Sequence, residues 1–238
     1  MLENGWTCWM LAVFLILMLP VMGTGARAES IVDAVPVCSV TVNGQRVKTI
    51  YETAVCHQRY WSAEPELHTT PVAIHVGEPG YEVEIDYADM EVTSAMVRPL
   101  SLGIEPEIRQ GRICFTVPNA AKLTVEINGS VEEALHLFLD TPDEDRPDPE
   151  GAKVQYFGPG VHRDVMVTVG NRETIYLDEG CVLYGQSFCG LGSNFTIAGH
   201  GVLCGSIYDR YKDTLVPLSL TNCSDFTIRD ITILDPSA

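Results

Sequence analysis

Four aspartates in the last third of the sequence have the clearest potential for acid–base chemistry: Asp178, Asp209, Asp230 and Asp235. A protonated carboxyl and an ionised carboxylate that face each other across a cleft can act as general acid and general base. Aspartate is also frequent in turns, where its side chain bonds to nearby backbone amides. We interpret all four as turn or corner residues, and the sequence predicts no catalytic residue among them.

Cysteine is the second residue type with a chemistry of its own. Seven cysteines follow Cys8: Cys38, Cys56, Cys114, Cys181, Cys189, Cys204 and Cys223. They contain no C-x-x-C pair and no Cys/His group at zinc-finger spacing, so no metal site and no cofactor-binding residue is predicted. Because their number is odd, they cannot all pair within the chain. Cys38 and Cys56 flank a hairpin-like segment, and they either form a disulfide or are both apolar core residues.

The N-terminus has the features of an export signal. Residues 9–22 are almost entirely apolar, and Ala26-Arg27-Ala28 has the A-x-A shape of a signal-peptidase site. This run of about 14 residues is shorter than the roughly 20 that a membrane-spanning helix needs. Against this, the segment before the run contains Glu3 and no Lys or Arg. Residues 1–28 are predicted to be a signal peptide, and the mature protein is expected to be secreted without a membrane contact.

The charge balance restricts the possible partners. The formal net charge is -17, and nucleic acids or anionic membrane surfaces require clustered Lys and Arg. Neither is therefore expected as a partner. A polyanionic sugar would bind only if a local basic groove overcame the overall charge, and the sequence alone does not show such a groove. The oligomeric state is left open.

The segment 29–140 is predicted to be a small β-sandwich. Residues Tyr81–Tyr87 alternate between apolar and acidic side chains, which is typical of a half-buried antiparallel strand. Asn43-Gly44 and Asn128-Gly129 stand between β-type runs and predict two-residue type I′ hairpin turns. Further strands are expected at residues 40–42, 46–50, 72–75, 91–97, 113–117, 123–127 and 135–139.

Residues 141–151 are predicted to be an exposed linker and to mark a domain boundary. This segment contains three prolines and five acidic residues, a composition that cannot form a core. It lacks the spacing of a calcium loop, so a solvated linker is favoured over a calcium site.

The segment 152–238 is similar to itself. Residues 174–185 align with residues 194–205 at an offset of 20, and residues 195–203 align with residues 226–234 at an offset of 31. Strand-turn-strand units of this length predict the coils of a parallel β-helix, each of which buries its inward apolar side chains against the next. No polar capping coil precedes Ala238, so the sequence predicts that the solenoid is truncated here.

The coil segments resemble the opening of the catalytic domain of glycoside hydrolase family 28, the polygalacturonases. The similarity covers Val154–His162, Thr174–Gly185, Ile197–Gly205 and Phe226–Ser237. The segments also resemble the related dextranase-like family, in which a β-sandwich precedes the β-helix. The resemblance implies an all-β protein with an N-terminal β-sandwich followed by the first coils of a right-handed parallel β-helix of the pectin-lyase type.

The family's catalytic motifs are missing from this sequence. In that family the aspartates of N-T-D and D-D motifs act with a G-H-G histidine and an R-I-K basic pair, and this sequence contains no N-T-D, D-D or R-I-K. Gly199-His200-Gly201 matches G-H-G, but it lies in an early coil and runs directly into Val202–Gly205. We therefore interpret His200 as a corner residue and transfer no catalytic, cofactor or metal-binding role from the family.

The resemblance implies the N-terminal part of a secreted glycosidase that hydrolyses a polysaccharide of the polygalacturonate type, or a related glycan, with inversion and without a cofactor. Its two carboxyl groups would lie roughly 6.5–9.5 Å apart, in sequence beyond Ala238. Two alternatives stay open. One is a non-catalytic β-helix surface or carbohydrate-binding protein, and the other is a β-helix polysaccharide lyase that uses calcium and a basic residue. Fold alone does not decide among them.

Overall fold

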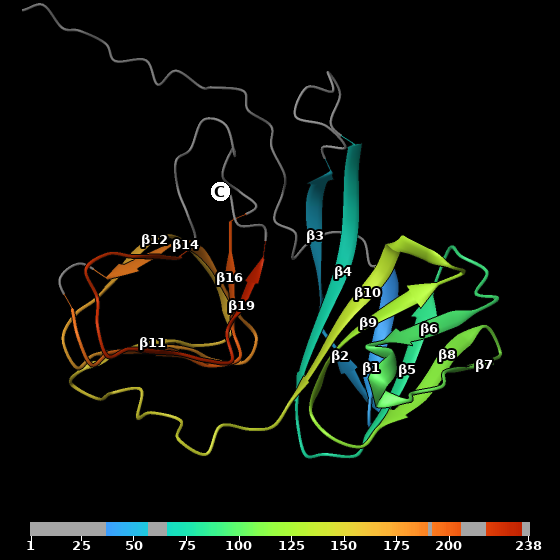
Figure 1. The fold of residues 1–238 in the computed structure, drawn as a ribbon, viewed down its shortest axis with the longest axis horizontal. Helices are drawn as coiled ribbons and strands as arrows, with labels where there is room; N and C mark the ends of the chain where they lie inside the picture. Colours follow the sequence, from blue (N-terminus) through green and yellow to red (C-terminus); the bar gives the residue numbers. More distant parts are fainter. Residues whose placement is uncertain (1–36, 57–65, 190–191, 206–217, 235–238) are drawn as a thin grey trace, which may run out of the picture.

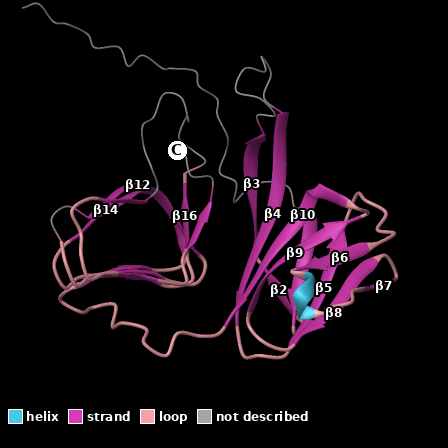
Figure 2. Ribbon diagram, viewed as in Figure 1, coloured by secondary structure: helices cyan, strands magenta, loops and turns pink. Residues whose placement is uncertain are grey.

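The computed structural model describes residues 37–56, 66–189, 192–205 and 218–234. Over these residues the protein is all-β, apart from one 3-10 turn, η2 (Leu100–Leu102) (Figure 2). This confirms the fold class predicted from the sequence. No helix among the described residues has the length and apolar character needed to cross a membrane.

The first part of the chain is a β-sandwich of two five-stranded sheets. One sheet has the order β2-β1-β5-β8-β7 and the other the order β3-β4-β10-β9-β6. The strands are β1 (Cys38–Val42), β2 (Gln45–Val47), β3 (Thr49–Cys56), β4 (Glu66–Val76), β5 (Tyr81–Tyr87), β6 (Ala95–Arg98), β7 (Glu107–Arg109), β8 (Arg112–Val117), β9 (Ala121–Ile127) and β10 (Ser130–Asp140). Apolar side chains from both sheets fill the space between them and form one core.

Local sequence signals account for much of the sandwich. Asn43 and Gly44 both have positive φ, 49° and 74°, and join β1 to β2. Asn128 and Gly129, with φ of 52° and 77°, join β9 to β10 in the same way. Both predicted type I′ hairpins are therefore confirmed. Strand β5 shows the predicted alternation of buried and outward residues.

One predicted strand is shorter than expected. The sequence suggested a strand at residues 91–97, but β6 begins only at Ala95. The Asn128 side chain accepts hydrogen bonds from the backbone amides of Thr93 and Ser94 and donates one to the carbonyl of Glu91. These contacts hold residues 91–94 as a loop over the β9–β10 turn, because they occupy backbone groups that a sheet would otherwise pair.

The second part of the chain forms a right-handed parallel β-helix with two parallel sheets (Figure 1). One has the order β11-β13-β15-β18 and the other β12-β14-β16-β19, with β17 pairing β14. The strands are β11 (Val154–Phe157), β12 (Gly160–Val169), β13 (Thr174–Leu177), β14 (Cys181–Cys189), β15 (Thr196–Ala198), β16 (Val202–Cys204), β17 (Leu218–Leu220), β18 (Thr227–Ile228) and β19 (Thr232–Leu234). The coil interior is apolar.

The first predicted repeat holds for one strand of the coil and not for the other. Val182 pairs with Val202, which is the predicted offset of 20. Thr174, however, pairs with Thr196, an offset of 22. The corner between the two strands is therefore two residues shorter in the second coil. Gly199-His200-Gly201 forms this shorter corner.

The second predicted repeat shows the same effect. Ile197 pairs with Ile228 at the predicted offset of 31, whereas Leu203 pairs with Ile233 at an offset of 30. The corner is one residue shorter again, so the predicted offset of 31 is wrong by one position in this strand. A slip of one residue exchanges the inward and outward faces of a strand. Leu234 accordingly pairs with Cys204 on the outward side of the coil.

The sandwich packs against the outward face of one coil sheet. Neighbouring residues of a strand point to opposite faces, so Leu183 lies in the coil interior while Val182 points toward the sandwich. We call the shared apolar contact the docking cluster. Its buried members are Ile50 and Val72 from the sandwich and Val182, Tyr184, Val202, Cys204 and Leu234 from the coils, with Ile74 and Phe138 partly buried beside them.

Candidate functional site at the domain junction

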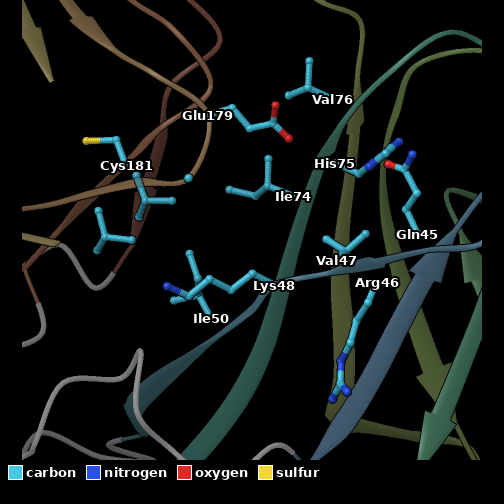
Figure 3. Close-up of a pocket in the computed structure, with 13 residues that line it drawn as sticks. Gln45, Arg46, Val47, Lys48, Ile50, Ile74, His75, Val76, Glu179 and Cys181 are labelled. Carbon is cyan, nitrogen blue, oxygen red and sulfur yellow. The ribbon is translucent and has the colours of Figure 1, made fainter. Parts of the chain in front are cut away.

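A hollow of about 280 Å³ lies between the sandwich and the coils, beside the docking cluster. We call it the junction hollow (Figure 3). On the sandwich side, β2 contributes Gln45 and Arg46, the residue after it is Lys48, and β4 contributes Ile74 and His75. The coil side is formed by the corner that contains Glu179 and by the start of β14. The sandwich and the coils thus form this site together.

Polar groups stand at both ends of the junction hollow. Figure 3 shows Glu179 reaching from the coil corner over Ile74, with its carboxylate beside β4. Lys48 runs alongside Ile50 toward the coils, while Arg46 points away along the sandwich. The floor between the two ends is apolar, because it is formed by the side chains of Ile50 and Ile74. These residues come from β3 and β4, which are adjacent strands of one sheet.

His75 is the imidazole of the junction hollow. Burial lowers its pKa below the ordinary value, although Glu179 acts in the opposite direction. At neutral pH this ring is therefore uncharged, with one nitrogen donating and the other accepting. The ring packs edge-on against Tyr81, at a centroid distance of 5.9 Å. It also lies against Gly77, where an added Cβ would come within 2.7 Å of Nε2.

The second polar group at the junction is centred on His200, which is 6% exposed. Its Nδ1 lies 3.7 Å from Oδ2 of Asp140, the last residue of β10, and its Nε2 lies 3.8 Å from Oδ1 of Asp143. Both distances exceed those of a hydrogen bond, and neither ring nitrogen has a hydrogen-bond partner among the described residues. The imidazole is thus held between two carboxylates by ionic attraction.

This arrangement shifts the pKa values of all three groups. Asp140 raises the pKa of His200 above its ordinary value and outweighs burial, and Asp143 and Asp230 add to the increase. Burial alone would raise the pKa of Asp140, but His200 and Lys122 hold it below the usual range. The pKa of Asp143 is also lowered, because Tyr176, Arg229 and His200 together outweigh its burial. The group favours a protonated His200 between two ionised carboxylates.

Two further contacts attach the linker to the coils. Asp143 accepts hydrogen bonds from the Tyr176 hydroxyl at 2.7 Å and from Arg229 at 2.6 Å. Arg146 donates to Asp178 at 2.6 Å. The remaining acidic residues of the linker are exposed. Most of the segment is exposed, but its Asp143 and Arg146 side chains are bound to specific coil residues.

The structure shows the surroundings of two of the four aspartates considered at the outset. Asp178 is buried at the corner after β13, where it accepts hydrogen bonds from Tyr156 and Arg146. Asp230 lies in a tight turn with φ of 63° and pairs with Arg229 at 2.8 Å. Asp209 and Asp235 lie outside the described residues. Asp178 and Asp230 therefore occupy the turn positions that the sequence suggested.

Among the described cysteines, Cys181 is the one whose thiol has the clearest environment. Cys181 lies in the coil core, and burial raises the pKa of its thiol to about 12, so it is not a nucleophile at neutral pH. Cys38 begins β1 in one sandwich sheet and Cys56 ends β3 in the other. The side chain of Cys56 lies outside the described residues, so the suggested disulfide stays a prediction. No group of three or more His, Cys, Asp or Glu among the described residues could hold a metal ion.

Sequence reasoning missed the residues that join the two parts of the molecule. Asp143 and Arg229 are 86 positions apart, and no local pattern links them. A weaker signal was present for the junction hollow. Arg46 and Lys48 flank the buried Val47, so strand alternation predicts that both cations point out of the sandwich core.

Fold and site define a class: an all-β protein in which a sandwich precedes the first coils of a right-handed parallel β-helix and packs against them. Among solved structures, Dex49A from Penicillium minioluteum matches with a TM-score of 0.51 and 14% sequence identity, over 80% of this chain and 53% of that chain. This chain thus spans about half the length of that structure. No family model matches the sequence, and no curated protein matches it. The similarity shows the fold.

Proposed function

We propose that this chain is part of an exported glycoside hydrolase that degrades a polysaccharide on a β-helix scaffold. The observation that carries the proposal is the combination of the sandwich-on-coil architecture with coil segments that resemble the polygalacturonases and the dextranase-like family. A rigid stack of coils suits this chemistry, because side chains on adjacent coils keep fixed spacings. Export rests on the A-x-A site before Glu29.

The proposed reaction is inverting hydrolysis of a polygalacturonate-type or related glycan. It needs one protonated carboxyl and one carboxylate that both reach the sugar, with space between them for water. The buried acids of the junction do not meet this need. Asp143 and Asp178 are already bonded to Arg229 and Arg146, so we propose a structural role for both. We propose that the catalytic pair belongs to coils other than those described.

The test compares the purified 238-residue chain with the product of the complete coding sequence. Release of reducing ends is measured on polygalacturonate and on dextran, and the anomeric configuration of the first product is followed by NMR. We expect background rates for the 238-residue chain, because general acid–base catalysis alone is worth about 10² to 10⁴ in rate. The complete product is expected to hydrolyse a glycan with inversion.

Two results would contradict the proposal. One is an absence of glycan cleavage by the complete product. The other is hydrolysis by the 238-residue chain that is abolished by His200→Gln or Asp209→Asn, since that would place catalysis in the coils interpreted here as structural. Unsaturated products would instead indicate the lyase alternative.

A further inference from the structure

The junction hollow is lined by two cations that form no ion pair with a described residue. The chain has 32 acidic residues and 15 Lys or Arg, and most described cations form ion pairs: Arg98, Arg109, Arg112, Lys122, Arg146 and Arg229. Arg46 and Lys48 both line the hollow, and neither makes an ion pair with a described residue. Two neighbouring cations without an ion pair among the described residues create a local positive field within an acidic protein.

The middle of the junction hollow is apolar and its far end is polar. Ile50 and Ile74 line this part with aliphatic side chains, and Val182 lines it from the coil side. At the far end stands the carboxylate of Glu179, which accepts hydrogen bonds. The imidazole of His75 and the amide of Gln45 also line the hollow, and both groups can donate and accept hydrogen bonds.

Each of these features selects a part of a ligand. An ammonium group recognises a carboxylate, and a carboxylate together with a neutral imidazole recognises hydroxyl groups. An aliphatic floor suits the C–H face of a pyranose ring. The volume of about 280 Å³ is at the small end of ligand pockets, which span roughly 300–1,000 Å³, so it suits a small ligand such as one sugar ring.

We propose that the junction hollow is a non-catalytic binding site for one uronic acid residue, with the sugar carboxylate at Lys48 and the hydroxyl groups at Glu179 and His75. The sandwich and the coils both contribute to this site, so the ligand also bridges the two parts of the chain. Arg46 adds to the electrostatic attraction from the edge of the hollow. The site deepens the proposed glycan-degrading function but does not require hydrolysis.

The experiment measures binding to the intact 238-residue chain by ligand-observed NMR, with D-glucuronate as the probe and its methyl ester as the uncharged analogue. We expect saturable binding of the acid and at least tenfold weaker binding of the ester. Lys48→Met keeps the aliphatic stem and removes the charge, so it should weaken binding of the acid at least tenfold while leaving binding of the ester unchanged. Glu179→Gln should weaken binding of both.

Lys153→Met is the matched control, because Lys153 is exposed and does not line the junction hollow. It should leave binding unchanged. Equal binding of acid and ester, no loss of binding in Lys48→Met, or no saturable binding at all would overturn the assignment. A uronic acid trisaccharide that binds more tightly than the monosaccharide would assign the hollow to a residue of a glycan chain, and equal affinity would assign it to the free sugar.

The binding result and the proposed hydrolysis are separately decidable. The NMR measurement needs no turnover. Binding of uronate without cleavage of any glycan would therefore support the binding site and contradict the proposed hydrolase function. Cleavage of a glycan without binding at the junction hollow would support the proposed hydrolase function and contradict the binding site.

Discussion

Gly199 shows how closely the second coil corner rests on the coil beside it. Its φ of 114° is disfavoured for residues with a side chain, and an added Cβ would lie 2.1 Å from the carbonyl oxygen of Leu177. The next glycine, Gly201, donates its amide to that same carbonyl at 2.9 Å. The shortened corner therefore depends on glycine for two reasons, backbone conformation and lack of space.

The variant Gly199→Ala separates these two reasons when it is compared with Gly44→Ala. Gly44 also has positive φ, 74°, but an added Cβ there meets nothing within 4 Å. Gly44→Ala should cost about 1–2 kcal/mol of unfolding free energy from backbone strain alone. Gly199→Ala should cost about 3 kcal/mol or more, because the clash with Leu177 adds an overpacking penalty. Chemical denaturation measures both, and equal losses would contradict the close approach seen in the structure.

His200 gives the junction a dependence on pH whose sign follows from its neighbours. The raised pKa of His200 contributes stability that is complete below its unfolded value of about 6.5 and is lost as pH rises through the higher folded value. The lowered pKa values of Asp140 and Asp143 contribute stability that is present above about 3.9 and is lost as pH falls through the lower folded values. The contact is therefore most stabilising between about pH 4 and 6.5.

The variant His200→Gln should remove the loss of stability that occurs as pH rises through the pKa of His200 in the folded protein. We expect it to lower stability by about 1–3 kcal/mol near pH 5.5 and by less near pH 9. Thermal unfolding followed over this range gives the measurement. His136→Gln is the control, since the His136 ring contacts the hydroxyl of Thr124 and forms no ion pair with a described carboxylate. A constant difference between His200→Gln and the unmodified chain at all pH values would contradict the ionic role.

At the scale of elements, the acidic linker at residues 141–151 is attached to the coils through the side chains of Asp143 and Arg146. We expect these contacts to control how often the linker detaches from the coils. Its composition indicates an exposed segment, and between Asp140 and Val154 it forms no strand or helix. Asp143 nevertheless bonds to coil residues on two sides. Proteolysis of such a segment follows the population of its detached state when opening is fast.

We predict that a glutamate-specific protease cleaves the linker within residues 141–151. Cleavage should be faster when the linker is detached from the coils. Asp143→Asn weakens the bonds to Tyr176 and Arg229 and should raise the initial rate about 5–30-fold, which corresponds to about 1–2 kcal/mol. Asp148→Asn is the matched control, because the Asp148 side chain is exposed and, among the described residues, accepts a hydrogen bond only from the nearby amide of Glu150. Peptide mass mapping identifies the cut, and preferential cleavage within β1–β10 would contradict the expected boundary.

Sequence patterns predicted the elements whose causes are local. The Asn-Gly hairpins and the alternation in β5 depend on a few consecutive residues, and both were found as expected. The strand expected at residues 91–97 was misjudged because its first half is held by Asn128, over thirty positions away. The repeat offsets were misjudged because the corner after Ala198 shortens, and only a three-dimensional stack shows which residues pair.

The junction was beyond the reach of local patterns for the same reason. Neither the contact of His200 with Asp140 nor that of Asp143 with Arg229 has a sequence signature, because each joins segments that fold separately. The motif Gly199-His200-Gly201 was correctly placed at a coil corner. What the motif did not show is that the histidine is buried against the end of the sandwich.

At the scale of the whole molecule, the docking cluster makes the sandwich and the coils depend on one another. Buried residues from both parts lie in one apolar group, and the ionic contacts of His200 border it. Burial of apolar surface between the sandwich and the coils stabilises their contact by about 25 cal/mol for each Å² removed from water. We therefore expect the purified chain to unfold in a single cooperative transition, with both parts losing structure together.

The variant Val202→Glu tests this coupling. Val202 points to the sandwich and is 2% exposed, so a carboxylate there would be buried without a partner and should force the two parts to separate. Calorimetry should then show two transitions in place of one. Ile50→Glu makes the same change from the sandwich side of the cluster and should give the same result if docking is the cause. Met166→Glu is the control, because Met166 lies in the same coil sheet but is 68% exposed. A single transition in both Val202→Glu and Ile50→Glu would show that cooperative unfolding does not depend on the docking cluster. Two transitions in the unmodified chain would show that the sandwich and the coils are stable independently of their contact.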